Sequence, residues 1–395
     1  MKERNYGIDL LRIVAMFFIC ILHICGQAGA MLRVSGYTGS YYACWFLETA
    51  AYCAVDIYGL ISGFAGVDAK HRPSRLAELW LRVFWYSALG SFLAVRVFHF
   101  ELLEAMPWKA LFPVSWKTYW YFSAYAGVFV IAPWLNRMVL ALTEKERKKL
   151  LAVLFVLCTV CTMIPRVSQT GSDFLGLGGG YSFLWLSILY VMGACLKKIR
   201  LRSHPPALYL SVFFCSVVFS WLFKILVENY TRGLYGKALY GRVFTSYTAP
   251  TMVICAVSLL LLFQNMKVGN EGFRSLIRFL SPMAFSVYLV QVQPYVWEYL
   301  LKDSCRHFYS LGPALCILMV LLSAFLLYCT CTAVDLIRVL VFRLLHVRGV
   351  CDAVFGFLGQ RLDRLFPSDG GGMINGSGCT SDENNLNNSD YTAQL

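Results

Sequence analysis

The chain has 395 residues, of which 58% are hydrophobic and only 14% are charged, and its mean hydropathy is +0.59. Such a composition is too apolar for an ordinary soluble domain and is typical of a protein with several membrane-spanning helices. The formal net charge of +13 does not indicate nucleic-acid binding, because the basic residues form short clusters between apolar runs. We therefore expect the lipid bilayer as a partner, and no nucleic acid.

Apolar runs of about 20 residues, the length that a helix needs to cross a membrane, recur along the chain. The ten predicted spans are 7–29, 42–65, 78–100, 118–140, 150–167, 181–198, 207–228, 245–265, 280–301 and 312–342. Alternate connections carry clusters of basic residues, at 70–75, 144–149, 197–202 and 274–278. Because positively charged loops remain in the cytoplasm, this alternation predicts an all-α integral membrane protein, a bundle of about ten transmembrane helices with both termini cytoplasmic.

The predicted spans fill residues 1–343 and leave no room for a soluble catalytic domain. Residues 344–367 are apolar at a helical spacing with arginines beside them, which predicts an amphipathic segment on the membrane surface. Residues 368–395 are polar with few large apolar side chains, which predicts a disordered cytoplasmic tail. The 15 cysteines lie mostly inside apolar runs, so we expect small buried hydrophobic residues and no metal site.

The first span carries two ionisable residues on one face. His23 follows Arg12 by three helical turns plus about 20°, so the two side chains lie roughly 16 Å apart on the same side of one helix. Gln27 falls near the same face. Taken singly, Arg12 could reach the lipid headgroups and His23 could be a packing residue. Together they favour a shared polar cavity inside the bundle, where ionisable groups in membranes usually point.

The stretch RNYGIDLLRIVAMFFICILH resembles the opening of the acyltransferase family 3 membrane proteins, whose first helix bears an arginine, ten residues and then a histidine, matched here by Arg12 and His23. In the second span, VDIYGLISGF resembles the family pattern VDxFFxxSGF, with Asp56 and Ser62 in place. Further stretches resemble later helices of the family, namely LWLRVFWYS (79–87), YWYFSAYAGVFVIAPWLN (119–136) and SPMAFSVYLVQ (281–291). The resemblance thus runs from about residue 4 to residue 300.

Two positions depart from the family pattern. Gln291 stands where the late helix normally has a histidine, so we expect it to form hydrogen bonds rather than to titrate. The family has an RxxR motif at its third helix, where Arg82 aligns best but Leu79 replaces the first arginine. A literal RxxR, formed by Arg72 and Arg75, lies upstream in the loop, so either set can supply the cytoplasmic arginines.

The resemblance implies an integral membrane O-acyltransferase of the cell (inner or plasma) membrane. It would move an acyl group, usually acetyl, from cytoplasmic acyl-CoA to a hydroxyl of a cell-surface glycan, glycolipid or other lipid-linked acceptor. Acyl-CoA (acetyl-CoA) is then a cosubstrate, and no permanently bound cofactor is expected. The alternative is a membrane transporter that carries an acyl group or a small substrate without chemistry. The acceptor, the acyl chain length and the oligomeric state stay open.

His23 is the expected catalytic base, because neutral imidazole suits proton removal at cellular pH and the other five histidines lie near span ends or in loops. It would act as a general base or through a transient acyl-histidine. Arg12 is expected to assist catalysis and to bind the phosphates of CoA. Asp56, expensive in a membrane unless paired, is expected to orient His23 or to pair with an arginine.

The remaining site assignments each have a structural alternative. Ser62, together with Arg75 and Arg82, is expected to bind acyl-CoA, although Ser62 and the following glycine could simply be a helix-packing pair. Trp120 and Tyr121 are expected to stack on the substrate, although an interfacial aromatic belt also explains such residues. For substrate binding we add two glutamines expected in the same cavity, Gln27 and Gln291.

Four other features have structural interpretations. Glu48 is expected to be a solvated carboxylate near the outer surface, and Lys224 and Glu228 form an i, i+4 pair. The sequence GLGGG at 176–180 lacks the residues of a phosphate loop and is expected to be a flexible outer loop. Pro294 is expected to kink the ninth span.

Overall fold

The computed structural model describes residues 4–31, 37–101, 106–114, 118–168, 173 and 175–365. All regular elements in these residues are helices, without a β-strand among them, which confirms the predicted all-α class. The predicted disordered tail, 368–395, lies outside the described residues.

The helices follow one another with short connections. In chain order they are α1 (Tyr6–Cys25), α2 (Gly39–Ala51), α3 (Ala54–Gly66), α4 (Pro73–Phe84), the π-turn η1 (Trp85–Leu89), α5 (Gly90–Arg96), α6 (Met106–Leu111), α7 (Trp120–Ala141), α8 (Glu144–Phe155), the π-turn η2 (Val156–Val160), α9 (Cys161–Ser168), η3 (Gly178–Gly180), α10 (Phe183–Lys198), α11 (Pro206–Tyr235), α12 (Pro250–Gln264), α13 (Glu271–Leu280), η4 (Ser281–Met283), α14 (Ala284–Gln291), η5 (Val296–Leu301), η6 (Arg306–Ser310), α15 (Pro313–Leu344) and α16 (Val347–Leu365).

Each of the ten predicted spans overlaps a helix, but the helices differ in length. Among the described residues, six helical stretches are long and apolar enough to cross a membrane: Tyr6–Cys25, Gly39–Gly66, Trp120–Ala141, Pro206–Tyr235, Glu271–Gln291 and Pro313–Leu344. The predicted third and fifth spans each contain a π-helical turn, η1 and η2, within a continuous helical path, and in the ninth span α14 ends before Pro294. The chain is therefore a multi-pass membrane protein, while ten crossings and cytoplasmic termini stay predictions.

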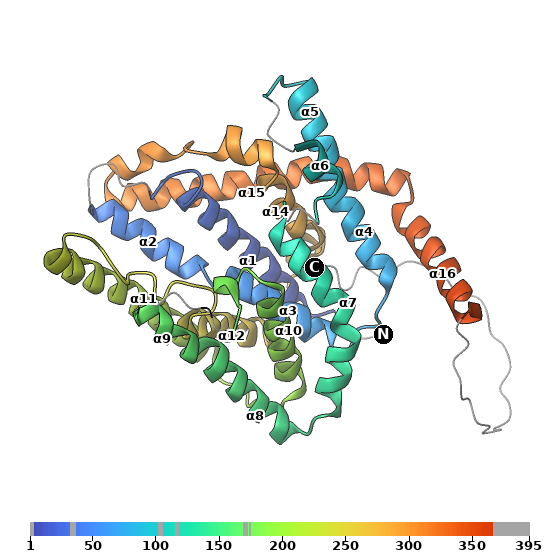
Figure 1. Cartoon of the computed structure of the whole chain (residues 1–395), viewed down its shortest axis with the longest axis horizontal. Helices are drawn as coiled ribbons and strands as arrows, with labels where there is room; N and C mark the ends of the chain where they lie inside the picture. The colour runs from blue at the N-terminus through green and yellow to red at the C-terminus, as the bar shows by residue number, and fades with distance from the viewer. Residues whose placement is uncertain are drawn as a thin grey trace.

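Helix α1 runs through the middle of the bundle (Figure 1) and contacts α2, α3, α12, α13, α14 and α15. Its apolar stretch is 67% buried, whereas those of α7 and α11 are each 22% buried. The outer helices α11 and α15 expose mainly apolar side chains, as expected of helices that face lipid. The central position of α1 explains how it can carry ionisable residues, since they face protein rather than lipid.

Helices α3 and α10 approach closely because glycines lie where they cross. A Cβ atom on Gly63 would lie 1.8 Å from the carbonyl oxygen of Tyr190. Beside it, the Ser62 hydroxyl donates to the carbonyl oxygen of Tyr58 at 2.7 Å. Gly63 therefore serves helix packing, as one interpretation of the Ser-Gly pair predicted.

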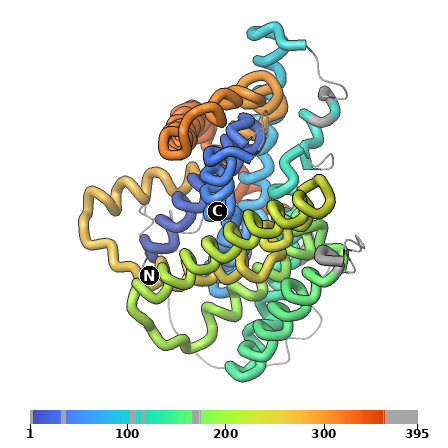
Figure 2. Tube along the Cα trace, turned by 90° about the vertical axis from the view of Figure 1, so that its left-hand side faces the viewer, coloured from blue at the N-terminus to red at the C-terminus, as the bar shows by residue number. Residues whose placement is uncertain are grey.

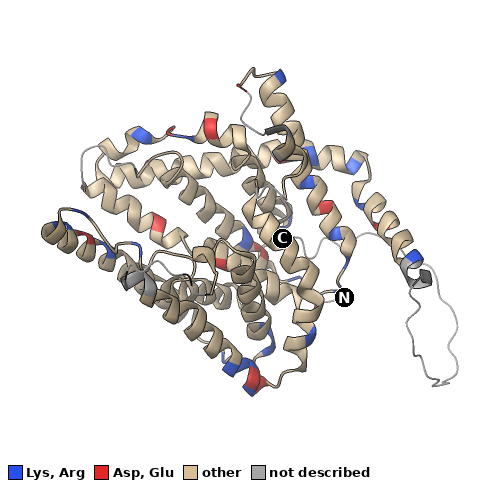
Figure 3. Cartoon of the chain, in the orientation of Figure 1, with Lys and Arg blue, Asp and Glu red and all other residues tan. Residues whose placement is uncertain are grey.

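Lysine and arginine gather toward the ends of the helices, and the middle stretches are mostly uncharged (Figure 3). The predicted pair of Lys224 and Glu228 is confirmed, with 2.5 Å between Nζ and Oε1 and both side chains buried.

The region of α5 and α6 projects from one end of the bundle in two perpendicular views (Figures 1 and 2). α16 packs on α4, where Ser74 donates to Asp352 at 2.5 Å. The predicted segment 344–367 is thus largely helical, and its place on the membrane surface stays a prediction.

Candidate active site

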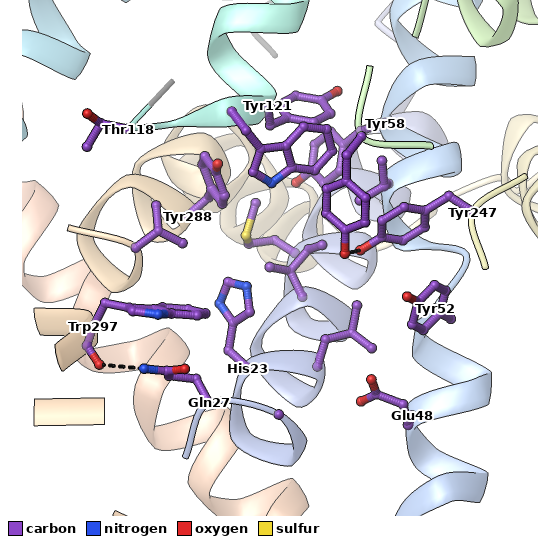
Figure 4. Close-up of a pocket in the computed structure, with 18 of the residues that line it drawn as sticks. His23, Gln27, Glu48, Tyr52, Tyr58, Thr118, Tyr121, Tyr247, Tyr288 and Trp297 are labelled. Carbon is purple, nitrogen blue, oxygen red and sulfur yellow. Dashed lines mark hydrogen bonds between the residues drawn. The ribbon is translucent and has the colours of Figure 1, made fainter. Parts of the chain in front are cut away.

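A cavity of about 740 Å³ lies beside the C-terminal half of α1, within the size range of small-molecule sites. Its wall is mainly apolar and aromatic, with a few polar side chains turned into it (Figure 4). Helices α1, α2, α3, α7 and α14 contribute to this wall, together with the segments that follow α1 and α14 and those that precede α7, α10 and α12. Among the predicted site residues, it brings together His23, Gln27, Trp120 and Tyr121.

His23 is held at the wall of this cavity by Gln291. Its Nδ1 atom lies 2.9 Å from Oε1 of Gln291, while Nε2 of Gln291 faces the sulfur atoms of Met16 and Cys20 at 3.9 and 3.8 Å. Because an amide oxygen can only accept, Nδ1 donates and the neutral ring keeps Nε2 as its proton acceptor. Trp297 packs edge-on against the imidazole, with ring centroids 4.9 Å apart. The imidazole is thus fixed in orientation and tautomer.

An aromatic surface flanks the opposite part of the cavity. The rings of Tyr52, Tyr247, Tyr181 and Trp120 follow one another with centroid distances of 4.7, 5.0 and 4.7 Å. Tyr121 is buried and Trp120 is partly exposed, and both line the cavity, which favours a substrate contact over an aromatic belt. We name the four rings of Tyr52, Tyr247, Tyr181 and Trp120 the aromatic wall.

The glycine run 176–180 holds part of the aromatic wall in place. Gly180 has a φ of 103°, and a Cβ atom there would lie 2.4 Å from the Cβ of Tyr247. Ser246 donates to the carbonyl oxygen of Gly179 at 3.3 Å. Gly180 therefore fits closely against Tyr247, whereas Gly176 and Gly179 have open space around them, and the flexibility of this loop stays a prediction.

Glu48 is buried, with 8% of its surface exposed, so the prediction of a solvated carboxylate was wrong. The reason is the place of α2, which packs against α1, α11 and α15 instead of lying at the edge of the bundle. Glu48 consequently lines the same cavity as His23, together with Arg242.

A second, smaller cavity of about 80 Å³ lies beside the N-terminal half of α1. Four cationic side chains line it, namely Arg12, Lys70, Arg72 and Arg75, and Ser62 lies among them. Burial and the positive charge of Arg72 lower the pKa of Arg75 below its ordinary value. Arg12 is paired with Asp9 at 2.7 Å, whereas Arg72 and Arg75 repel each other in a partly buried place, which provides an attractive site for an anion. We name this cavity the basic pocket.

Arg12 and His23 therefore line two cavities and not the shared one that their spacing predicted. The cavities follow one another along the predicted face of α1, and Met16 lies on the His23 side. Two tyrosines lie between them. Tyr58 lines the large cavity and donates to the carbonyl oxygen of Arg12 at 2.8 Å, and Tyr121 stacks on Tyr125 of the basic pocket with centroids 6.5 Å apart.

Asp56 and Arg82 line neither cavity. The fully buried Asp56 accepts from Nε1 of Trp185 at 3.0 Å, which joins α3 to α10 and leaves the orientation of His23 to Gln291. Arg82 donates to the carbonyl oxygen of Pro282 at 3.2 Å and approaches Glu78 at 3.8 Å. Of the two arginine sets considered, the literal RxxR thus lies in the basic pocket, and Arg82 joins α4 to η4.

Sequence reasoning did not identify Glu48, Arg242, Tyr52, Tyr247 or Trp297 as cavity residues. Gln291 was identified, but as a substrate contact and not as the partner of His23. Gln291 is separated from His23 by 268 positions, so no local pattern links the two. The break between α2 and α3, which places Glu48 and Tyr52 at the cavity, likewise has no clear signal in a continuous apolar run.

Comparison with known proteins agrees with the expected family. Residues 5–331 match the family model of an acyltransferase domain, the one expected from the opening helix. The match includes every residue that lines the large cavity and the basic pocket. No curated protein and no solved structure matches the chain.

Proposed function

The chain belongs to acyltransferase family 3, and from this premise we propose that it transfers an acyl group, acetyl in the simplest case, from cytoplasmic acyl-CoA to a hydroxyl group. The acceptor is a glycan or glycolipid of the cell surface, and the bilayer is the inner or plasma membrane. Family membership and the apolar helices establish a membrane acyltransferase that acts between an acyl donor and an acceptor. The identity of each substrate is the proposal.

The observation that carries the proposal is the fixed imidazole in a ligand-sized cavity. With Nδ1 donating to Gln291, Nε2 of His23 takes the proton of the acceptor hydroxyl. The hydroxyl oxygen attacks the thioester carbonyl, a C–O bond forms, and the C–S bond breaks. The proton then passes from Nε2 to the departing thiolate, so that the products are an ester and free CoA, and His23 is neutral again.

The basic pocket supports a cytoplasmic donor site. Arginine side chains bind phosphate oxygens with two parallel hydrogen bonds, and Arg12, Arg72 and Arg75 all line this pocket. Ser62 adds a hydroxyl beside them. If the CoA phosphates occupy this pocket, the thioester arm must pass Tyr58 and Tyr121 to reach His23 along α1. The positive charge of the basic pocket thus favours the phosphate groups of acyl-CoA. The large cavity, which is mainly apolar, favours the acyl end.

A transporter would need a cavity but no base. The hydrogen bond between His23 and Gln291 fixes a proton-accepting nitrogen, which favours chemistry over passage alone. Incubation of the purified chain with radiolabelled acetyl-CoA and membrane glycans separates the two. Label on a glycan, or on the protein as an acyl-histidine, is the expected result. Labelled acetyl-CoA that is bound or moved across vesicles without any transfer would instead support a transporter.

A further inference from the structure

We infer that Glu48 is an acceptor-binding residue, whose carboxyl group receives a hydroxyl hydrogen bond from a neutral, hydroxyl-rich acceptor in the large cavity. The inference rests on the proposed acyl transfer and adds a residue that recognises the acceptor. Glu48 comes from α2, whereas the base His23 comes from α1. Figure 4 shows the carboxyl group of Glu48 turned toward the same space as the imidazole.

The first argument is an unsatisfied oxygen. Oε2 of Glu48 is buried and accepts no hydrogen bond within the described part of the chain. A buried polar atom without a partner costs about 1–3 kcal/mol, and native structures rarely retain one without a reason. Because this side chain lines a ligand-sized cavity, a donor on a bound molecule can satisfy it.

The second argument is the charge around Glu48, which decides the kind of donor. Arg242, in the same cavity wall, and the buried Lys224 lie close enough to act on Glu48 electrostatically. Lys224 is already paired with Glu228, so a cationic ligand would be repelled mainly by Arg242, whereas a neutral hydroxyl would not be repelled. The surroundings of Glu48 thus favour hydroxyl donors over an amine.

The third argument is the neighbouring aromatic wall. Tyr52 and Tyr247 belong to this wall and line the cavity on the side of Glu48 (Figure 4). Aromatic faces beside a few hydrogen-bonding groups suit a ligand with apolar C–H faces and hydroxyl edges, which is the chemistry of a pyranose ring. Glu48 is accordingly expected to contribute to specificity for one hydroxyl of such a ring.

The test uses the full chain in lipid nanodiscs with radiolabelled acetyl-CoA. Methyl glucopyranoside, its monodeoxy analogues and methyl glucosaminide serve as acceptor probes. Glu48→Gln keeps the volume of the side chain and replaces one acceptor oxygen by a donor. Glu144→Gln is the matched control, because Glu144 lies in α8, lines neither cavity and is paired with Lys148 at 2.7 Å.

We expect Glu48→Gln to raise the acceptor KM by about tenfold or more. Acetyl-CoA hydrolysis without acceptor and the acetyl-CoA KM of Glu48→Gln should stay within about twofold of the wild type. All kinetic values of Glu144→Gln should also stay within about twofold of the wild type. One monodeoxy sugar should lose about tenfold in kcat/KM with the wild type and little with Glu48→Gln, as expected when both changes remove the same hydrogen bond.

Three results would overturn the inference while acetyl transfer stands. They are an unchanged acceptor KM for Glu48→Gln, a wild-type preference for methyl glucosaminide over the neutral sugar, and His23-dependent acetyl-CoA hydrolysis with no acetylation of any glycoside. A wild-type chain that neither binds nor hydrolyses acetyl-CoA would instead contradict the proposed function, and the inference with it.

Discussion

Replacement of Gln291 tests whether a hydrogen bond positions the imidazole of His23. Gln291→Met keeps a side chain of similar volume but removes the oxygen that lies 2.9 Å from Nδ1. Gln291 is fully buried, so water cannot easily take the place of this oxygen. Loss of a buried hydrogen-bond partner costs about 1–3 kcal/mol, which corresponds to a fall in kcat of about 5- to 150-fold if the transition state bears all of it.

The assay is steady-state acetyl transfer at saturating acetyl-CoA, with acetyl-CoA affinity measured separately by equilibrium binding. Gln291→Glu, which keeps an acceptor oxygen at the same place, should retain most of kcat, and both variants should bind acetyl-CoA like the wild type. Wild-type kcat for Gln291→Met would refute the positioning role. Equal losses in both variants, accompanied by a lower Tm, would assign Gln291 to packing alone.

Three further predictions follow from the two cavities and the helix crossings. Arg75→Ala should raise the acetyl-CoA KM by about tenfold or more. It should not lower Tm, because the charge of Arg75 is repelled by Arg72 when no anion is bound. An unchanged KM would show that the CoA phosphates do not bind in the basic pocket. Arg82→Ala should lower stability by about 1–3 kcal/mol, because it removes the hydrogen bond from a buried arginine to the carbonyl oxygen of Pro282, as measured by thermal unfolding in detergent. The acetyl-CoA KM of the folded fraction should stay unchanged, as measured by kinetics. Gly63→Ala should lower the free energy of unfolding by about 1–3 kcal/mol or more, because the added methyl group clashes with the carbonyl oxygen of Tyr190. Gly233→Ala is the control and should not lower Tm, because a Cβ atom there has nothing within 4 Å. Equal Tm values for the two alanine variants would contradict the close crossing of α3 and α10.

The sequence was sufficient for the features that depend on one helix. Apolar run length predicted the all-α membrane class, and helical periodicity placed Arg12 and His23 on one face of α1. The family pattern led to Ser62, which lies in the basic pocket. These features follow from local spacing, which a single sequence displays.

Features that depend on how distant helices meet could not be predicted in the same way. Tyr58 and Tyr121 divide the space beside α1 into two cavities, and neither shows this in its local pattern. Alignment favoured Arg82 for the CoA site, but the packing of α4 directs this arginine to the carbonyl oxygen of Pro282. The sequence around Glu48 does not show that this residue is buried. Its burial results from the packing of α2 against α1, α11 and α15.

The central claim is that His23 performs the chemistry while the basic pocket holds the donor. The most direct measurement is acetyl transfer and acetyl-CoA binding by purified His23→Ala in nanodiscs. The account predicts a fall in transfer of at least about 100-fold, the usual contribution of a general base, with the Kd for acetyl-CoA within about twofold of the wild type. Transfer at the wild-type rate, or an equal loss of binding and transfer, would contradict it.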